Sequence, residues 1–513
     1  MSDPIHLELR DGDRPRVLER LRELGFEEGG IHTLAHTVLD TFDGRFAEAG
    51  LRLVLQEGET RELSLTGPGV VPAAVRVDSV PRFARDLPRG PFRARLVDLT
   101  EVRALLPKMK VVARVTPLVL RDGAGKAVVR VLVQDQVDVV GSDGAGVPEG
   151  IVEVREVAGF PKAGKRALAA LESLALPPLD GDAFAAYATG AGMDLGGHQD
   201  SPTVPLDPGM RAVDGFAAVL ANLKATVEAN WQGTLDQVDP EFLHDLRVAL
   251  RRTRAVLGQG KKVLPPDIVP VARERFAEFA RLTGPARDLD VYVIEWDGYV
   301  QPLGAEVADA LEPVRQFLEE RLRTAHGELE EAMRSPETAE LMEQWDRWLD
   351  ELGPHRPQGE HAKRKLGRVV RQQVRKAQEK LVHDGRTIGP ETPAERLHDL
   401  RKDAKKVRYL LECFGSLLPP EATRQYVKRL KALQNNLGEH QDAEVHVALI
   451  REVADELNQR GVEPRTLIAI GQLTERLEQV RQASRAEFAE RFDSYDSRAT
   501  EDALDAVLHG IGS

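Results

Sequence analysis

Two segments of this chain contain the same five-residue motif, Leu-His-Asp-Leu-Arg, followed by a run of basic residues. They read FLHDLRVALRRTRAVL from Phe242 and RLHDLRKDAKKVRYLL from Arg396, and their histidines, His244 and His398, are 154 positions apart. The same offset relates two further pairs of segments: Pro265-Pro266 with Pro419-Pro420, and TGPARDLDV (283–291) with NLGEHQDAEV (436–445). A repeat of this length predicts a duplicated fold. We therefore expect two helical bundles related by an approximate two-fold axis.

The texture of the sequence changes near residue 210. From Met210 onward the apolar residues recur with the 3.6-residue period of helices, which predicts an all-α region. Before it, segments with alternating and β-branched residues lie between Gly, Pro and Asp, which predicts an antiparallel sheet or barrel. The expected strands are 51–56, 61–66, 109–120, 126–140 and 150–157, and the expected short helices are 14–25 and 163–175.

These textures predict a multidomain chain. We expect an N-terminal α+β domain with an antiparallel β-barrel over residues 1–195, and a linker rich in Gly, Pro and Asp over 196–209. An all-α domain of two pseudo-symmetric four-helix bundles follows over 210–505, with repeats at about 210–355 and 356–505.

Composition limits the classes of function. The net charge is −13, so the whole molecule is not a general nucleic-acid binder. Hydrophobic residues make up 42% and aromatic residues 5%, which indicates aliphatic cores. The single cysteine, Cys413, excludes an intramolecular disulfide and fits a reducing compartment, where it is expected to be a small core residue. The sequence shows no signal peptide and no membrane-spanning stretch, so we expect a cytoplasmic protein.

The repeated segments place their basic residues on one face of a helix. At 100° per residue, Arg247, Arg251 and Arg254 share a stripe with His244, while the leucines form the opposite, core-facing side. The second copy repeats this stripe with His398, Arg401, Lys405 and Arg408. The residues that broaden the basic side are Arg252 and Lys406.

Further basic residues follow the same pattern. The expected helix 361–380 has a cationic ridge of Arg364, Arg368, Arg371 and Arg375, and the next long helix has Arg424, Lys428 and Lys431 on one face. Residues 361–408 contain 15 Lys and Arg against 6 Asp and Glu, and residues 242–262 contain 6 against 1. Like charges spaced by three or four residues repel one another, so a bound polyanion would stabilise such stripes. The alternative interpretation is that each stripe is an ordinary solvent-exposed helix face with no bound ligand.

For the two histidines, three interpretations stay open: packing at the edge of the core, contact with phosphate, and catalysis.

These residues carry a family resemblance. Two copies of an HDLR motif with a basic stripe, each followed by Pro-Pro and a G-x-x-x-D element, resemble the conserved histidine α-helical domain (CHAD) over about residues 210–505. The resemblance implies paired four-helix bundles around a basic groove that binds inorganic polyphosphate, and an association with polyphosphate granules. It implies that the groove is lined by His244, Arg247, Arg251, Arg254, His398, Arg401, Lys405 and Arg408.

Residues 1–195 resemble a divergent CYTH domain, the triphosphate tunnel fold that often precedes CHAD. The segment VLDTFDGRFAEAGLRLVLQEGETRELSLTG resembles the family's Phe-Asp-Thr segment and its following Leu-Arg-Leu-Arg strand, and IVEVREVAGFPKAG resembles its closing acidic strand. The resemblance implies an eight-stranded antiparallel barrel with a charged lumen. The expected anion-binding or rim residues of this tunnel are Arg10, Arg52, Arg76 and Arg114.

The catalytic signature of that family is largely replaced. The opening Glu-x-Glu-x-Lys reads His6-Leu7-Glu8-Leu9-Arg10, and the second arginine of the Leu-Arg-Leu-Arg strand is Val54. Glu8 and Glu153 alone make a thin site for Mg²⁺ or Mn²⁺, which need converging carboxylates. We therefore expect no catalytic residues and no required cofactor, with Mg²⁺ or Mn²⁺ relevant only to an active tunnel.

The sequence thus predicts a polyphosphate-binding protein. Two alternatives are kept: a metal-dependent tripolyphosphatase or triphosphatase in the barrel, and nucleic-acid binding by the basic helices. The second is less favoured because Tyr409 and Tyr426 are the only aromatic candidates for base stacking near the stripes.

Overall fold

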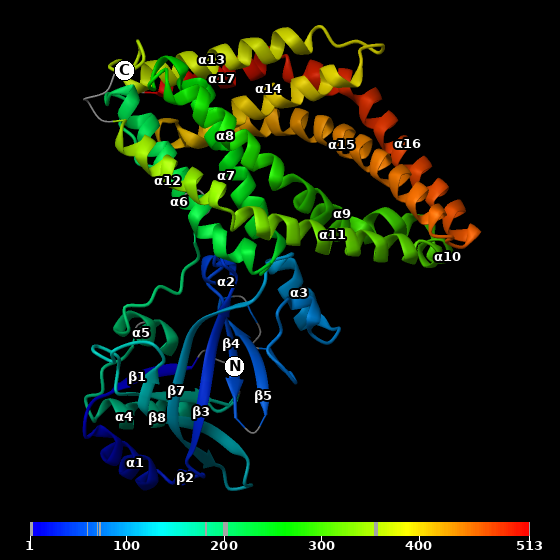
Figure 1. The fold of residues 1–513 in the computed structure, drawn as a ribbon. Helices are drawn as coiled ribbons and strands as arrows, with labels where there is room; N and C mark the ends of the chain where they lie inside the picture. Colours follow the sequence, from blue (N-terminus) through cyan, green and yellow to red (C-terminus); the bar gives the residue numbers. More distant parts are fainter. Residues whose placement is uncertain are drawn as a thin grey trace. The chain divides into compact units, whose positions relative to one another are not determined.

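The chain forms two compact units, Met1–Gln199 and Asp200–Ser513, in the computed structural model (Figure 1). The structure describes residues 4–58, 60–68, 70, 73–157, 159–179, 182–198, 204–352 and 358–511. An α+β unit with an antiparallel sheet precedes an all-helical unit, so the predicted fold class is confirmed.

The first unit is built on an antiparallel sheet. Its strands are β1 (Ile5–Leu9), β2 (Glu27–Glu28), β3 (His32–Asp40), β4 (Arg52–Glu57), β5 (Arg61–Thr66), β6 (Ala73–Arg76), β7 (Leu106–Arg121), β8 (Ala127–Val139) and β9 (Gly150–Glu156). They pair in the order β1-β9-β8-β7-β3-β4-β5-β6, and β2 adds to β7. The five expected strands are present as β4, β5, β7, β8 and β9, while β1, β2, β3 and β6 were not predicted.

Helices cover both faces of this sheet. They are α1 (Asp13–Glu23), α2 (Arg45–Glu48), α3 (Pro91–Thr100), α4 (Pro161–Glu172) and α5 (Ala183–Gly190), with the 3₁₀ turn η1 (Ala84–Asp86). One face packs against α1 and α4 through valines and leucines, and its far end packs against α2 and α3. The opposite face packs against α5 through Ile151, Val38 and Tyr187.

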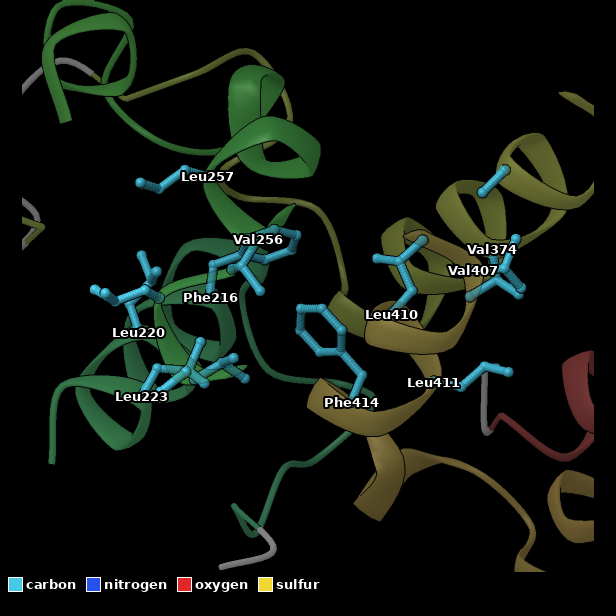
Figure 2. Close-up of a cluster of buried hydrophobic side chains, with 14 of the residues drawn as sticks. Phe216, Leu220, Leu223, Val256, Leu257, Val374, Val407, Leu410, Leu411 and Phe414 are labelled. Carbon is cyan, nitrogen blue, oxygen red and sulfur yellow. The ribbon is translucent and has the colours of Figure 1, made fainter. Parts of the chain in front are cut away.

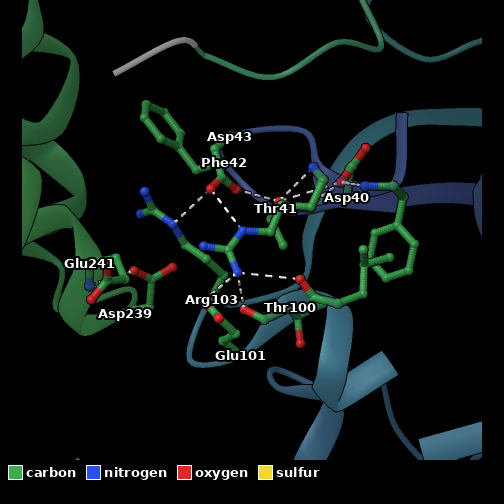
Figure 3. Close-up of polar contacts among 12 residues, drawn as sticks. Asp40, Thr41, Phe42, Asp43, Thr100, Glu101, Arg103, Asp239 and Glu241 are labelled. Carbon is green, nitrogen blue, oxygen red and sulfur yellow. Dashed lines mark hydrogen bonds and ion pairs between the residues drawn. The ribbon is translucent and has the colours of Figure 1, made fainter. Parts of the chain in front are cut away.

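A network of polar contacts fixes the turn after β3 (Figure 3). The carboxylate of Asp40 accepts hydrogen bonds from the backbone N–H groups of Phe46 and Ala47, at 3.0 and 2.9 Å, and so satisfies the first turn of α2. Arg45 donates to Asp43 at 2.9 Å, and the buried Arg103 approaches the same carboxylate at 3.5 Å. The Phe-Asp segment that suggested a family motif therefore has a structural role here.

The two ends of the sheet are not joined within the described ranges. The outer edge of β1 is covered by the segment 177–179, because Glu8 N–H donates to Pro177 O at 2.8 Å and Leu179 N–H donates to His6 O at 3.0 Å. At the other end, β6 pairs with β5 alone. The segment 177–179 therefore blocks the outer edge of β1 from pairing with another chain.

The second unit is helical throughout its described ranges. Its helices are α6 (Ala212–Leu235), α7 (Pro240–Gln259), α8 (Ile268–Leu282), α9 (Gly284–Val300), α10 (Ala305–Ala310), α11 (Glu312–Met333), α12 (Pro336–Asp350), α13 (Leu366–Gly385), α14 (Ala394–Cys413), α15 (Pro420–Gln459), α16 (Pro464–Tyr495) and α17 (Arg498–Gly510). Short 3₁₀ turns are η2 (Gly260–Lys262), η3 (Gln301–Leu303) and η4 (Gly415–Leu417). None of these helices is both long and apolar enough to cross a membrane.

The helix bounds reproduce the sequence repeat. Helix α14 begins and ends 154 residues after α7, and α13 begins 154 residues after α6. The copies differ where α8 and α9 are separate helices, interrupted at Thr283, while α15 runs unbroken over the corresponding part of the second repeat. Pro285, at the second position of α9, lacks the N–H that an unbroken helix would use there. The expected boundary between the repeats, at 355–356, lies outside the described residues.

A continuous apolar core joins the two repeats (Figure 2). Phe216 of α6 and Phe414, next to α14, are fully buried and their ring centroids are 5.0 Å apart. A second core lies at the other end of the unit, where α9, α10 and α11 pack against α15 and α16. The leucine sides of α7 and α14 both face the shared core, as their periodicity predicted.

Parts of the expected linker are ordered against the two units. His198 N–H donates to Phe42 O at 2.9 Å within the first unit. In the second unit, Leu206 N–H donates to Ser416 Oγ at 3.2 Å, and Gly367 N–H donates to Pro208 O at 2.9 Å. Residues 199–203 of the expected linker lie outside the described residues.

The shared core should dominate the stability of the helical unit. Phe414→Ala removes a fully buried ring at the junction of the repeats, and we expect it to lower the free energy of unfolding by about 3–5 kcal/mol. Denaturant titration followed by circular dichroism at 222 nm measures this change. Ile468→Ala is the control because this side chain is 66% exposed, and its effect should stay within about 0.5 kcal/mol. Equal effects of both substitutions would contradict the shared-core assignment.

Candidate functional site

A large cavity lies between the two repeats, on the polar side of α7 and α14. Its volume is about 800 Å³. It is lined from α7 by His244, Val248, Arg251 and Arg252, from α14 by Arg401, Lys405, Arg408, Tyr409 and Glu412, from α15 by Ala432, Gln434, Asn435, Asn436, Gly438, Glu439 and Asp442, and from α16 by Glu487 and Arg491. We call this space the inter-repeat groove. Six cationic side chains and four carboxylates line it, so its formal charge is positive.

Arg251 and Lys405 occupy equivalent positions in the two repeats and both line the groove. Within the described parts of the chain, neither forms a side-chain hydrogen bond or an ion pair with a carboxylate. Burial lowers the pKa of Lys405 to about 8 from an ordinary value of 10.5. The positive charges of Arg401, Arg251 and Arg408 lower it further, and the negative charge of Asp442 opposes them. The protein therefore holds a cation where its own surroundings disfavour one.

A second pair of equivalent arginines contacts the aspartates of the G-x-x-x-D element. Arg401 donates to Asp442 at 3.1 Å, and Arg247 lies 4.0 Å from Asp288. Arg247 also donates to Thr283 Oγ1 at 2.8 Å, and burial lowers its pKa to about 10. These contacts order the two guanidinium groups.

The glycines of that element leave room for these arginines. A Cβ atom built on Gly284 would lie 3.6 Å from Arg247 Nη1, and one built on Gly438 would lie 3.7 Å from Arg401 Nη2. These are ordinary van der Waals distances, so each glycine lies directly beside the guanidinium group that the aspartate of the same element contacts.

Other cations of the groove are paired with carboxylates. Glu412 accepts from Arg252 at 2.7 Å and from Arg408 at 2.5 Å, and Glu487 accepts from Arg491 at 3.1 Å. These pairs, on α7, α14 and α16, reduce the attraction of the surrounding parts of the groove for an anion. Arg251 and Lys405 therefore carry most of the uncompensated positive charge.

The two histidines have different surroundings. His244 lines the groove, whereas His398 does not, and His398 Nδ1 lies 2.6 Å from the acceptor Oε1 of Gln441. One ligand atom each from Glu241, His244 and Asp245 lies within 4.8 Å of the others. The histidine stripe of the sequence therefore reaches the groove in the first repeat.

A smaller cavity of about 200 Å³ adjoins Arg251 on the other side. Its lining residues are Arg247, Arg251, Arg254, Ala277, Ala280, Arg281 and Thr283. We call it the four-arginine pocket. Arg281 was missed by the sequence analysis, although it lies 154 residues before Asn435, which lines the groove.

Two buried amides of the groove were also missed. Gln434 and Asn436 line it, and the side-chain oxygen and nitrogen of Gln434 and the side-chain oxygen of Asn436 have no hydrogen-bond partner. Their signal in the sequence was weak, because Asn and Gln are common on helices. Buried polar atoms without partners cost stability, and of these three atoms Gln434 Nε2 is the donor that an anionic ligand could satisfy.

Several predicted residues lie away from both cavities. Arg364 precedes α13 instead of lying within it, Arg371 donates to Leu508 O at 3.0 Å, and Arg375 donates to Asp505 at 2.8 Å. The expected ridge therefore faces α17 in part. Besides Arg364 and Arg375, the exposed members of the predicted set that line neither cavity are Arg368, Arg424, Lys428 and Lys431.

Lys406 and Tyr426 also depart from the expected surface. The pKa of Lys406 is lowered by burial and by cations of α8 and α13, so its side chain faces those helices and not the groove. Tyr426 is fully buried and its hydroxyl bonds to Gln378 at 2.6 Å, so it cannot stack on a base. Tyr409 does line the groove.

In the first unit, Glu8 and Glu153 lie on the paired strands β1 and β9, on the same face of the sheet and two residues apart in register. Glu153 is buried beside His6 and forms an ion pair with Arg155. Burial opposes its ionisation, but the hydrogen bond from His6 and the charge of Arg155 hold the pKa of Glu153 below its usual value. Glu8 is on the neighbouring strand, opposite Ile151. Together they form no cluster of three metal-ligating groups within the described residues.

The face that would line a tunnel is occupied by α5. The rings of Phe184 and His36 are 5.7 Å apart, and Tyr187 donates to Gln134 at 3.3 Å. Arg52 donates to Asp182, the N-cap of α5, at 3.1 Å. The chain's own helix thus fills this face and binds its predicted anion-binding arginine.

The remaining arginines of the first unit are similarly placed. Arg114 forms an ion pair with Asp135, and Arg10 and Arg76 are exposed. In the register of the sheet, Arg76 lies opposite Glu62.

The helical unit contains a CHAD domain. Residues 218–451 match the CHAD domain family model, in agreement with the repeated motif. Two uncharacterized proteins of Mycobacterium tuberculosis, from strains CDC 1551 / Oshkosh and ATCC 25618 / H37Rv, are each 28% identical over 256 residues, which is 48% of this chain. The chain covers 45% of the length of these relatives.

Solved structures resemble each unit. The CHAD domain of the plant Ricinus communis is 25% identical, with a TM-score of 0.46, covering 60% of this chain and 95% of that chain. A putative adenylyl cyclase from Hippeastrum, described as having a dominant triphosphatase activity, is 16% identical, with a TM-score of 0.28, covering 38% of this chain and 99% of that chain.

The lowered pKa of Lys405 can be measured directly. Competitive acetylation followed by mass spectrometry should give a titration midpoint for Lys405 near pH 8. Arg401→Gln removes a neighbouring positive charge and should raise this midpoint, while Asp442→Asn removes the opposing carboxylate and should lower it. A midpoint near 10.5 in all three proteins would contradict the buried, cation-flanked position of this lysine.

Proposed function

We propose that the helical unit binds inorganic polyphosphate in the inter-repeat groove. The observation that supports this most directly is the pair Arg251 and Lys405, which reach one cavity from the two repeats without carboxylate partners. Such a pair repels itself in the absence of a ligand. A chain of phosphates supplies the missing negative charge.

The chemistry of the lining suits phosphate oxygens. Arginine can hold a phosphate through two parallel hydrogen bonds, while lysine acts as a mobile point charge. Gln434 Nε2, which has no hydrogen-bond partner, adds an uncharged donor to the same wall. Regular spacing of cations along a helix also matches the regular spacing of charges along the polymer. A single compact anion would not require lining residues from both repeats around a cavity of about 800 Å³, whereas a polymer would.

The predicted triphosphatase is not proposed for the first unit. Its two candidate carboxylates belong to no cluster of three metal-ligating groups within the described residues, and α5 packs on the face where a substrate would lie. We also favour polyphosphate over nucleic acid, because Tyr426 is buried and Tyr409 is left as one aromatic side chain on the groove. An association with polyphosphate granules is part of this proposal.

Charge reversal at the centre of the groove tests the proposal. The double variant Arg251→Glu/Lys405→Glu should weaken binding of long-chain polyphosphate by at least about 100-fold, because two charge-assisted contacts are lost and two repulsions added. Isothermal titration calorimetry at low salt measures this. Arg465→Gln is the control because this arginine is exposed and paired with Glu463 at 2.8 Å. Unchanged binding by the double variant would exclude the groove as the site.

Binding should also depend on pH through Lys405. A bound phosphate favours the ammonium form and raises the pKa of Lys405 from about 8, so binding is coupled to the uptake of a proton at pH values above 8. The affinity should therefore fall about ten-fold from pH 7 to pH 9. Lys405→Arg should remove most of this fall. Titrations in buffers of different ionisation enthalpy would reveal the proton uptake, and an affinity independent of pH would rule out direct contact by Lys405.

A further inference from the structure

The four-arginine pocket differs in charge from the groove beside it. Arg247, Arg251, Arg254 and Arg281 line it, and none of its lining residues is acidic. The Nε atoms of Arg247 and Arg251 are buried without a hydrogen-bond partner. The groove, in contrast, has four carboxylates among its lining residues. The smaller space therefore has the higher density of positive charge.

The repeat explains how this difference arises. Glu412 of the second repeat, which pairs with Arg408 of its own repeat and with Arg252 of the first, lies 154 residues after Gly258. The first repeat therefore has no carboxylate at this position to pair with Arg254, the equivalent of Arg408. At another equivalent pair of positions, the first repeat has Arg281 and the second has the neutral Asn435. Both substitutions add positive charge to the first repeat's side of the axis.

The neighbouring cations intensify the field in the pocket. Partial burial and the charges of Arg273 and Arg281 lower the pKa of Arg254. Burial also lowers the pKa of Arg247. The charge of Asp288 opposes this effect, and the charges of Arg251 and Arg287 add to it. A compact anion with more than one negative charge would relieve this repulsion better than a monoanion.

The ends of a phosphate chain have this property. An internal phosphate carries one charge, whereas a terminal phosphoryl group carries about −1.5 to −2 near pH 7, as phosphate monoesters do. A volume of about 200 Å³ equals roughly six water molecules at liquid density, which is enough for one or two phosphoryl groups. Arg251 lines both the pocket and the groove, so the two spaces adjoin at this side chain, which can contact phosphates in either of them.

We propose that the four-arginine pocket binds the terminal phosphoryl group of a linear phosphate chain. This inference rests on the proposed function, and it gives the bound chain a fixed end and a direction. Arg281 and Arg254 select the dianionic terminus, while Arg251 contacts the next phosphate. The second repeat cannot do the same because Asn435 and Glu412 stand at the corresponding places.

Linear tripolyphosphate and cyclic trimetaphosphate test this inference. Both contain three phosphates, but the ring has no terminal phosphoryl group. Calorimetry at fixed ionic strength should show that the full-length protein binds the linear compound at least about ten-fold more tightly than the ring. Arg281→Asn, which introduces the second-repeat residue, should reduce this linear-to-cyclic ratio at least about five-fold. Both Arg281 and Arg254 are exposed, so Arg254→Gln serves as a second variant that is expected to fold.

The control and the long polymer separate the outcomes. Arg465→Gln removes one exposed positive charge elsewhere and should leave the ratio unchanged. If the ring binds as tightly as the linear compound, or if Arg281→Asn weakens both equally, end recognition is wrong. If long-chain polyphosphate still binds in that case, the proposed function is retained. Failure of long-chain polyphosphate to bind the wild-type protein would instead overturn the proposed function itself.

Discussion

Burial of the leucine faces of α7 and α14 in one core is the constraint on which the helical unit depends. Each of these helices has one apolar side, and the shared core takes both. The basic stripes are then left on the polar sides, where they meet across the axis between the repeats. Arg251 and Lys405 approach the same cavity because the leucines behind them leave no other orientation. Hydrophobic burial thus stabilises a cluster of like charges that would otherwise repel.

The periodicity of the sequence was sufficient to predict the features that depend on a single helix or strand. The duplication and the residues on the stripe of α7 could be read from spacing alone, and so could five of the strands. Positions that depend on packing between elements could not. The ridge around Arg371 has a regular period but contacts α17, and Lys406 turns toward α8 and α13. Arg281 and Gln434 carry no local signal, because their role arises from which helices become neighbours.

The two repeats have diverged in ways that matter chemically. Thr283 and the following Gly-Pro interrupt the first copy, while α15 continues through the corresponding place in the second. Acidic residues have gathered on the second side of the axis, where Glu412 and Glu487 pair with arginines. The first unit shows divergence of another kind. There α5 packs on the sheet face with Tyr187 and Phe184, so side chains on that face are selected for packing.

Helix α15 has a mechanical consequence. Its 40 residues span about 60 Å at the usual rise, and they contribute to both cores of the helical unit. The stretch from Gln434 to Asp442, which forms one wall of the groove, lies between those two anchors. A rod held at both ends resists bending at its middle. A displacement of α11 or α16 at the second core would therefore be transmitted along α15 to this wall of the groove. Conversely, a ligand bound to the wall would restrict the motion of α15 at the second core.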